Sequence, residues 1–162
     1  MNKRKRINYL IVSSIVAITI FVLFFTNYPF AKTESNNYEN YFGDTVEKAR
    51  NLTLSYDHRF NLWQIGNYSN NDMVEITDAF LPKFLDQLKT FNATEAPQNY
   101  QKAKDLFTNS LLNEVKSVQY MKEYLLKNDS SKKVLSDNYL SESFKFESLA
   151  FQSFRNASNG QQ

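Results

Sequence analysis

The stretch PQNYQKAKDLFTNSLLNEVKSVQYMKEYLLK, residues 97–127, has the clearest helical pattern in the chain and decides the fold class. Its apolar residues return at intervals of three and four and so form one stripe along a helix. The stripe consists of Tyr100, Ala103, Phe107, Leu111, Val115, Val118, Met121 and Leu125. Pro97 suits the first turn, because its missing N–H would be unpaired there. A helix of about 30 residues is about 45 Å long, and other helices must cover its stripe.

Three other stretches, residues 44–65, 72–91 and 131–155, show the same periodicity and are separated by short polar breaks. The chain has only three Gly and three Pro, too few for the many turns of a β-sandwich or barrel. The sequence therefore predicts an all-α domain, an antiparallel (up-down) four-helix bundle, over residues 42–156. Residues 157–162 are expected to be a disordered tail.

Caps and breaks are expected at particular residues. Asp44 and Glu47 match a capping box, in which Glu47 reaches back to the N–H of the capping residue. Pro82 lies within the second stretch and predicts either a kink or a helix that ends near Phe80 and then restarts.

The last stretch has the least regular pattern. Its expected core side chains are Leu135, Tyr139, Phe144, Leu149, Phe151 and Phe154. Its serines are expected to line the side that faces solvent; they are Ser136, Ser141, Ser143, Ser148 and Ser153.

Residues 7–25 form a run of 19 residues without a charge, rich in Ile, Val, Leu and Phe. As a helix this run spans about 28 Å, close to the thickness of a bilayer's hydrocarbon core. Four basic residues precede it and only Lys32 closely follows it, so the N-terminus is expected to stay in the cytoplasm. The expected segments are a cytoplasmic basic tail (1–6), a transmembrane signal-anchor helix (7–28) and a polar linker (29–41).

A cleaved signal peptide is the alternative interpretation of this run. Its best cleavage site would be Pro29-Phe30-Ala31, which lacks the small residues that such sites carry. Both interpretations place the helical domain outside the cytoplasm. The chain is expected to be a single-pass protein of the cell membrane, with an extracytoplasmic C-terminal domain. Its richness in Asn, Lys, Ile, Tyr and Phe suggests an AT-rich bacterial genome.

Charge and cysteine content exclude several classes of function. Without the four basic residues of the tail, 15 of the 19 Lys and Arg remain against 17 Asp and Glu. A nucleic-acid binder would carry a basic face, so nucleic acid is not an expected partner. The chain has no Cys, which excludes disulfides, thiolate catalysis and thiolate metal ligands.

No catalytic, cofactor-binding or metal-binding residues are predicted. His58 is the only histidine, and its neighbour Asp57 would point about 100° away on a helix, so Asp57 cannot orient it as a triad acid does. Zinc sites and di-iron bundle sites need several His or Cys residues, or paired Glu-x-x-His motifs. The three Gly lie too far apart for a phosphate-binding loop.

Four residues of the first helical stretch form a second apolar strip, away from its main stripe. They are Leu54, His58, Leu62 and Ile65. One interpretation is that the strip belongs to the core, because this helix is buried on two sides or because the strip covers the kinked second helix. The other is that the strip binds a partner, since exposed apolar patches often mark contact sites. Leu62→Glu separates these interpretations, since a core position would lose folding and a surface position only binding.

The leading hypothesis is a non-enzymatic envelope protein whose helical bundle binds another envelope protein as an accessory subunit. A small-molecule-binding bundle with a sizeable interior cavity is one alternative. A carboxylate- or serine-based envelope hydrolase is another, and convergent carboxylates with shifted pKa values would favour it. A solid core with an apolar outer strip would favour protein binding.

Overall fold

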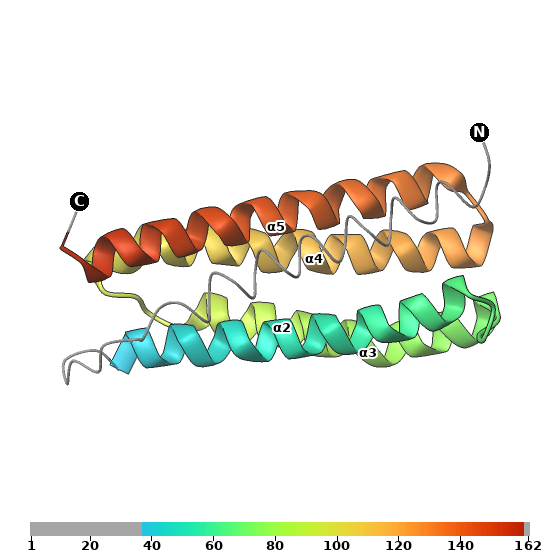
Figure 1. The fold of residues 1–162 in the computed structure, drawn as a ribbon, viewed down its shortest axis with the longest axis horizontal. Helices are drawn as coiled ribbons and strands as arrows, with labels where there is room; N and C mark the ends of the chain where they lie inside the picture. The colour runs from blue at the N-terminus through green and yellow to red at the C-terminus, as the bar shows by residue number, and fades with distance from the viewer. Residues whose placement is uncertain (1–36, 161–162) are drawn as a thin grey trace. The chain divides into compact units, whose positions relative to one another are not determined.

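The computed structural model describes residues 37–160, and all regular structure in this part is helical. Its elements in chain order are α2 (Asn37–Gln64), α3 (Asn70–Ala93), the short 3₁₀ helix η1 (Gln98–Tyr100), α4 (Gln101–Lys127) and α5 (Ser130–Ser158). Figure 1 shows α2 and α3 as one helical hairpin and α4 and α5 as a second. The predicted all-α class with four long helices is confirmed for these residues.

Side-chain contacts show that neighbouring helices run in opposite directions. Phe107 near the start of α4 packs on Phe91 near the end of α3, with ring centroids 5.0 Å apart. Lys122 near the end of α4 forms an ion pair with Asp78 in the first half of α3. These contacts make α3 and α4 antiparallel, and the short connections impose the same relation within each hairpin.

Helix α2 begins at Asn37, well before the expected N-cap at Asp44. Tyr38 and Phe42 are buried and extend the apolar stripe of α2 toward its N-terminus. Their burial stabilises helical turns in residues 37–41, which the Asn-rich composition assigned to the linker. The predicted capping box at Asp44 is therefore wrong, and residues 37–41 of the expected linker are helical.

Helix α3 passes through Pro82 without ending, so the predicted break near Phe80 does not occur. Phe80 and Leu81 before the proline, and Phe84 and Leu88 after it, pack in the same core cluster. Burial on both sides holds the helix together although Pro82 cannot donate to the carbonyl of Asp78.

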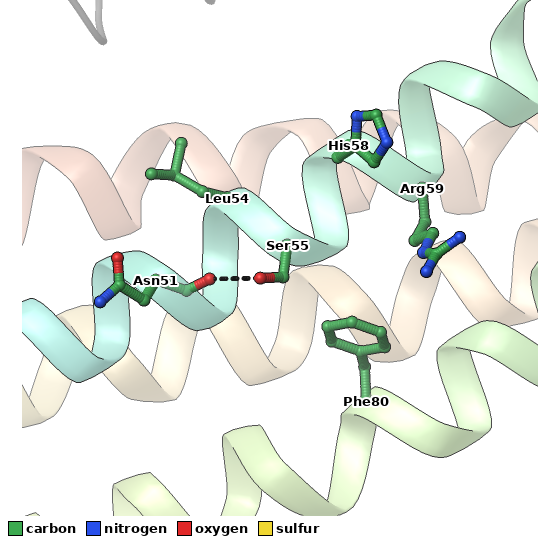
Figure 2. Close-up of a pocket in the computed structure, with 6 residues that line it drawn as sticks. All are labelled: Asn51, Leu54, Ser55, His58, Arg59 and Phe80. Carbon is green, nitrogen blue, oxygen red and sulfur yellow. Dashed lines mark hydrogen bonds between the residues drawn. The ribbon is translucent and has the colours of Figure 1, made fainter.

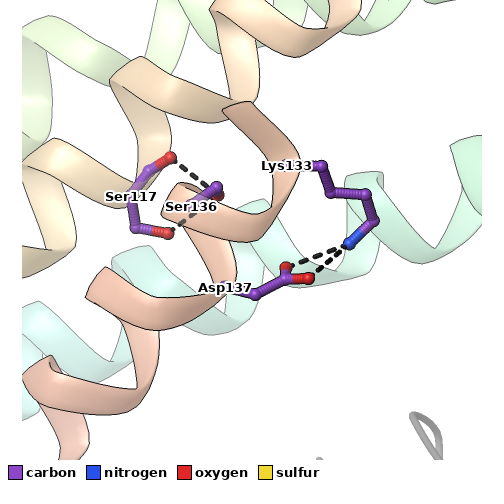
Figure 3. Close-up of polar contacts among 4 residues, drawn as sticks. All are labelled: Ser117, Lys133, Ser136 and Asp137. Atoms are coloured by element: carbon purple, nitrogen blue, oxygen red, sulfur yellow. Dashed lines mark hydrogen bonds and ion pairs between the residues drawn. The ribbon is translucent and has the colours of Figure 1, made fainter. Parts of the chain in front are cut away.

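Helices α4 and α5 pack through small side chains. The Ser110 hydroxyl donates to the backbone carbonyl of Ser143 at 2.9 Å. The Ser136 hydroxyl donates to the backbone carbonyl of Ser117 at 2.8 Å (Figure 3). A serine reaches the backbone of another helix only where the two backbones approach closely. Fully buried alanines continue the same seven-residue repeats, Ala103 on α4 and Ala150 on α5.

This packing corrects the expected orientation of α5. Ser136 and Ser143 were expected to face solvent and are buried against α4. Phe144 and Leu149 were expected in the core and are about 40% exposed. The prediction was wrong because it weighed hydrophobicity alone, whereas a close helix pair buries its smallest side chains and satisfies serine hydroxyls across the contact.

We expect Ser143→Leu to lower the free energy of unfolding by about 2 kcal/mol or more, because the larger side chain forces α4 and α5 apart and removes a buried hydrogen bond. Ser141→Leu makes the same change at an exposed position of α5 and is expected to change stability by less than about 0.5 kcal/mol. Urea denaturation followed by circular dichroism measures both. Equal losses from the two substitutions would contradict the serine contact.

Two apolar regions make up the core of the bundle. One lies where α2 begins and contains Phe42, Phe91, Tyr100, Phe107 and Phe154. The other contains Tyr56, Met73, Phe84, Val115, Val118, Met121 and Leu125. Glu114 lies on α4 between the residues that belong to these two regions, and it is buried.

The expected transmembrane segment (7–28), the basic tail (1–6) and residues 29–36 of the expected linker lie outside the described residues. Within residues 37–160, no helix combines the length and the apolar composition that crossing a membrane requires. At the other end, α5 continues to Ser158, so the first residues of the expected disordered tail are helical.

Candidate functional site

The strip predicted on α2 lies mostly at the surface. Leu54 is 36% exposed. Ile65 is 70% exposed and lies in the turn that follows the end of α2 at Gln64. His58 is also exposed, whereas Leu62 is half-buried. The strip is therefore not a second core face of α2, although Leu62 has partial cover.

A surface hollow of about 530 Å³ adjoins this strip. It is lined by Asn51, Leu54, Ser55, His58 and Arg59 from α2 and by Phe80 from α3 (Figure 2). Figure 2 shows Leu54 and His58 on the side of α2 away from Phe80, with Ser55 and Arg59 nearer the Phe80 ring. The hollow opens to solvent between two helices, so it suits a segment of another protein better than an enclosed small molecule.

Polar groups at the hollow are partly held by the domain itself. The Ser55 hydroxyl donates to the backbone carbonyl of Asn51 at 2.7 Å. Arg59 donates from Nη1 to the Tyr68 hydroxyl at 2.8 Å, which positions its guanidinium beside the hollow. An apolar edge with an arginine and an imidazole beside it can bind an apolar side chain and an acidic or carbonyl group together.

A second arrangement, which the sequence analysis did not find, lies between α2, α4 and α5. Glu114 of α4 is only 7% exposed, and its carboxyl is hydrogen-bonded to the Thr53 hydroxyl of α2. Half-buried carboxylates face it from two other helices, Asp57 from α2 and Glu147 from α5. Arg50 of α2 lies close enough to Glu147 to favour its charged form.

The pKa values of these carboxyl groups are raised toward or above neutral pH. Burial raises the pKa of Glu114 to about 8; its bond to Thr53 lowers the pKa, while the charges of Glu147 and Asp57 raise it further. Burial raises the pKa of Glu147 to about 7, against the opposing effect of Arg50. Burial alone raises the pKa of Asp57 to about 6. Each shift disfavours the charged carboxylate in the folded domain.

The hydroxyl of Thr53 connects Glu114 to the backbone of α2. The Thr53 hydroxyl has one hydrogen and two acceptors in reach, the Ala49 carbonyl oxygen at 2.9 Å and a Glu114 oxygen. If Thr53 donates to Ala49, the contact with Glu114 is a hydrogen bond only when the carboxyl group donates. Because the Ala49 carbonyl also accepts the backbone N–H of Thr53 within α2, the contact fits both forms of Glu114: Thr53 donates to a charged carboxylate or accepts from a neutral carboxyl group.

The sequence contained a signal for this arrangement. Phe107, Glu114 and Met121 lie seven residues apart and so occupy one side of α4, which places a glutamate in an apolar stripe. One sequence could not show which residues of α2 and α5 would meet it.

The buried carboxyls can store protons, but catalysis requires a group that reaches a substrate. Glu114 does not line the described hollow, and Thr53 covers its carboxyl. Within residues 37–160, no group of three or more His, Cys, Asp or Glu side chains is arranged to hold a metal ion.

Comparison with known proteins gives this domain no relatives: no family model, no curated protein and no solved structure matches the chain. The chain is thus characterised by its own features, which are a four-helix domain with an exposed apolar strip on α2 and a carboxyl cluster beneath it.

Proposed function

We propose that the chain is a single-pass protein of the bacterial cell membrane whose extracytoplasmic helical domain binds another envelope protein through the strip on α2. The single observation that carries the binding role is the hollow itself, which the exposed Leu54 and the ring of Phe80 line. Apolar side chains grouped at a hollow favour a contact site, whereas scattered ones carry no such meaning.

The membrane part of the proposal is supported by the sequence. The 19 uncharged residues at 7–25 are long enough to span a bilayer, and the four basic residues before them favour a cytoplasmic N-terminus. An anchor of this kind would hold the domain near the partner and raise the local concentration of both.

The carboxyl cluster is the one observation that favours the hydrolase alternative, because shifted pKa values are frequent at active sites. However, the carboxyl with the largest shift is buried under α2, where no substrate group can contact it. The exposed strip is accessible without any rearrangement, so protein binding is the function that the site supports best.

Site-specific photo-crosslinking in the native membrane tests this proposal. A photoreactive residue at position 65 is expected to give one discrete adduct, while the same residue at Asn138, an exposed position of α5, is expected to give none. Leu54→Glu should remove the adduct, since it puts a charge in the apolar contact. Leu85→Glu is the matched control, because Leu85 is an exposed leucine of α3 outside the strip and the hollow.

Circular dichroism of both variants must show an intact domain before their adducts are compared. Equal adducts at positions 65 and 138, or loss of the adduct with Leu85→Glu as well, would contradict a specific site on α2.

A further inference from the structure

Five asparagines begin an acceptor triplet, which is Asn-x-Ser/Thr with x other than Pro, the signal for attachment of N-linked glycans outside the cytoplasm. All five asparagine side chains lie in the described residues and are exposed. In chain order they are Asn51, Asn67, Asn92, Asn128 and Asn156. The folded domain distinguishes these triplets by what it does with the serine or threonine hydroxyl of each.

Glycan transfer to an acceptor triplet involves two side chains at once. The enzyme modifies the asparagine and binds the hydroxyl two residues later. In an α-helix, side chains two residues apart point about 200° apart, so they cannot both face one enzyme. A hydroxyl that is bonded within the domain is also not available to the enzyme. A triplet that is used in the folded domain is therefore expected in a turn, with a hydroxyl that has no partner.

The first and fifth acceptor triplets lie inside helices, where the domain already uses their hydroxyls. In α2, the Thr53 hydroxyl is hydrogen-bonded to the buried Glu114 carboxyl. In the last turn of α5, the Ser158 hydroxyl is hydrogen-bonded to the Tyr100 hydroxyl, with 3.3 Å between the two oxygens. Neither triplet meets either condition.

The second and third acceptor triplets end outside helices, but their hydroxyls are also bonded. The Ser69 hydroxyl belongs to the capping box of α3: it donates to the Asp72 carboxylate at 2.7 Å and accepts from the Asp72 backbone N–H at 3.2 Å. The Thr94 hydroxyl donates to the Tyr41 hydroxyl at 2.8 Å. An enzyme would have to break these contacts to bind either hydroxyl.

The fourth acceptor triplet forms the turn that joins α4 to α5 (Figure 1). Asn128 has the left-handed conformation, with a φ of 52°, and Asp129 is extended, so helical spacing does not separate Asn128 from Ser130. Asp129 caps α5 by accepting from the backbone N–H of Ser131 at 2.9 Å, and the cap does not need the Ser130 hydroxyl. Within residues 37–160, neither the Asn128 amide nor the Ser130 hydroxyl forms a side-chain hydrogen bond, and both side chains are exposed.

We propose that Asn128 is the acceptor of an N-linked oligosaccharide in the folded domain. Its amide nitrogen attacks C1 of the first sugar of a lipid-linked oligosaccharide, bound to an oligosaccharyltransferase of the membrane. The N–C1 bond forms and the C1–O bond to the lipid phosphate breaks. The phosphate keeps the bonding electrons, and one amide proton goes to a base of the transferase. The inference rests on the extracytoplasmic placement proposed above, because the transfer takes place on that side of the membrane.

Peptide mapping by mass spectrometry tests the site on the full chain, isolated from the membranes of the cells that make it. The peptide that contains residue 128 is expected to carry the added mass of a glycan, and the peptides of the other four acceptor triplets are expected to be unmodified. Transfer to the chain before it folds would not distinguish the triplets in this way.

Two variants and a control separate recognition of the triplet from an effect on the fold. Ser130→Ala keeps Asn128 and the turn but removes the hydroxyl, so the glycan should be lost. Ser130→Thr keeps a hydroxyl at this position, so the glycan should remain. Ser131→Ala is the matched control, because it removes the neighbouring serine side chain outside the triplet and should leave the glycan in place. Circular dichroism should show the same helicity for all three.

An unmodified residue 128 would overturn the proposal, and so would a glycan that persists in Ser130→Ala. Glycans on Asn51 and Asn156 as often as on Asn128 would contradict selection by the folded domain. Labelling of Ser141→Cys with a membrane-impermeant maleimide separates this inference from the proposed function. If intact cells are labelled while residue 128 is unmodified, only the glycan site is rejected. If they are not labelled, the extracytoplasmic placement is rejected with it.

Discussion

Phe42→Ala is expected to lower the free energy of unfolding of the helical domain by about 3–5 kcal/mol, the range for a large aromatic side chain removed from a core. Phe42 is 2% exposed and stacks on Phe154. Its ring also contacts Phe91, Phe107 and Phe151 from three other helices, with centroids 5.4 to 6.3 Å apart. A cavity at this position therefore weakens the contacts of α2 with all of its neighbours at once.

Phe144→Ala makes the same change at a position that is 42% exposed, and we expect it to cost less than about 1 kcal/mol. Urea denaturation followed by circular dichroism at one pH compares the two variants. Similar losses would mean that α2 does not join the bundle at Phe42, and that the linker extends beyond residue 41.

The stability of the domain is expected to decrease as pH rises from about 4.5 to about 8, by at least about 3 kcal/mol. The pKa of Glu114 is raised to about 8, that of Glu147 to about 7 and that of Asp57 to about 6, in each case chiefly by burial. The unfolded chain therefore binds fewer protons than the folded domain in this window, and stability falls until all three groups are charged.

Hydrogen bonds at the starts of α3 and α5 affect the stability of the domain only at pH values below this range. They lower the pKa values of Asp72 and Asp129, so stability from those caps is lost only as the carboxylates become protonated in acid. Denaturation curves at intervals from pH 4.5 to pH 9 measure the slope. Glu114→Gln should flatten its upper part and make the domain more stable than the wild type near pH 8. Stability that increases with pH in both proteins would contradict the buried, protonated Glu114.

The sequence predicted the number of long helices because apolar periodicity determines which side of each helix is buried. It was most successful for α4, whose stripe is regular from Tyr100 to Leu125 and is buried throughout. It failed at the start of α2, where tertiary burial outweighs the polar local composition. It also failed at Pro82, where burial on both sides outweighs the missing N–H.

The site could be predicted only in part, for a similar reason. An exposed strip depends on the spacing within one stretch of sequence, so Leu54 and Ile65 could be identified, although Ile65 lies in the turn after α2. The carboxyl cluster depends on three helices that meet at Glu114, and the serine contact depends on the distance between α4 and α5. Both depend on contacts between residues of different helices, which the periodicity of a single stretch of sequence cannot predict.

Cysteine labelling tests the proposed membrane topology most directly. The chain contains no Cys, so single cysteines can be introduced without background, at the exposed Ser141 in one variant and at Asn2 in another. In intact cells, a membrane-impermeant maleimide should label Ser141→Cys and should label Asn2→Cys only after lysis. If Ser141→Cys is labelled only after lysis, the helical domain lies in the cytoplasm, and an envelope partner for the strip on α2 is excluded.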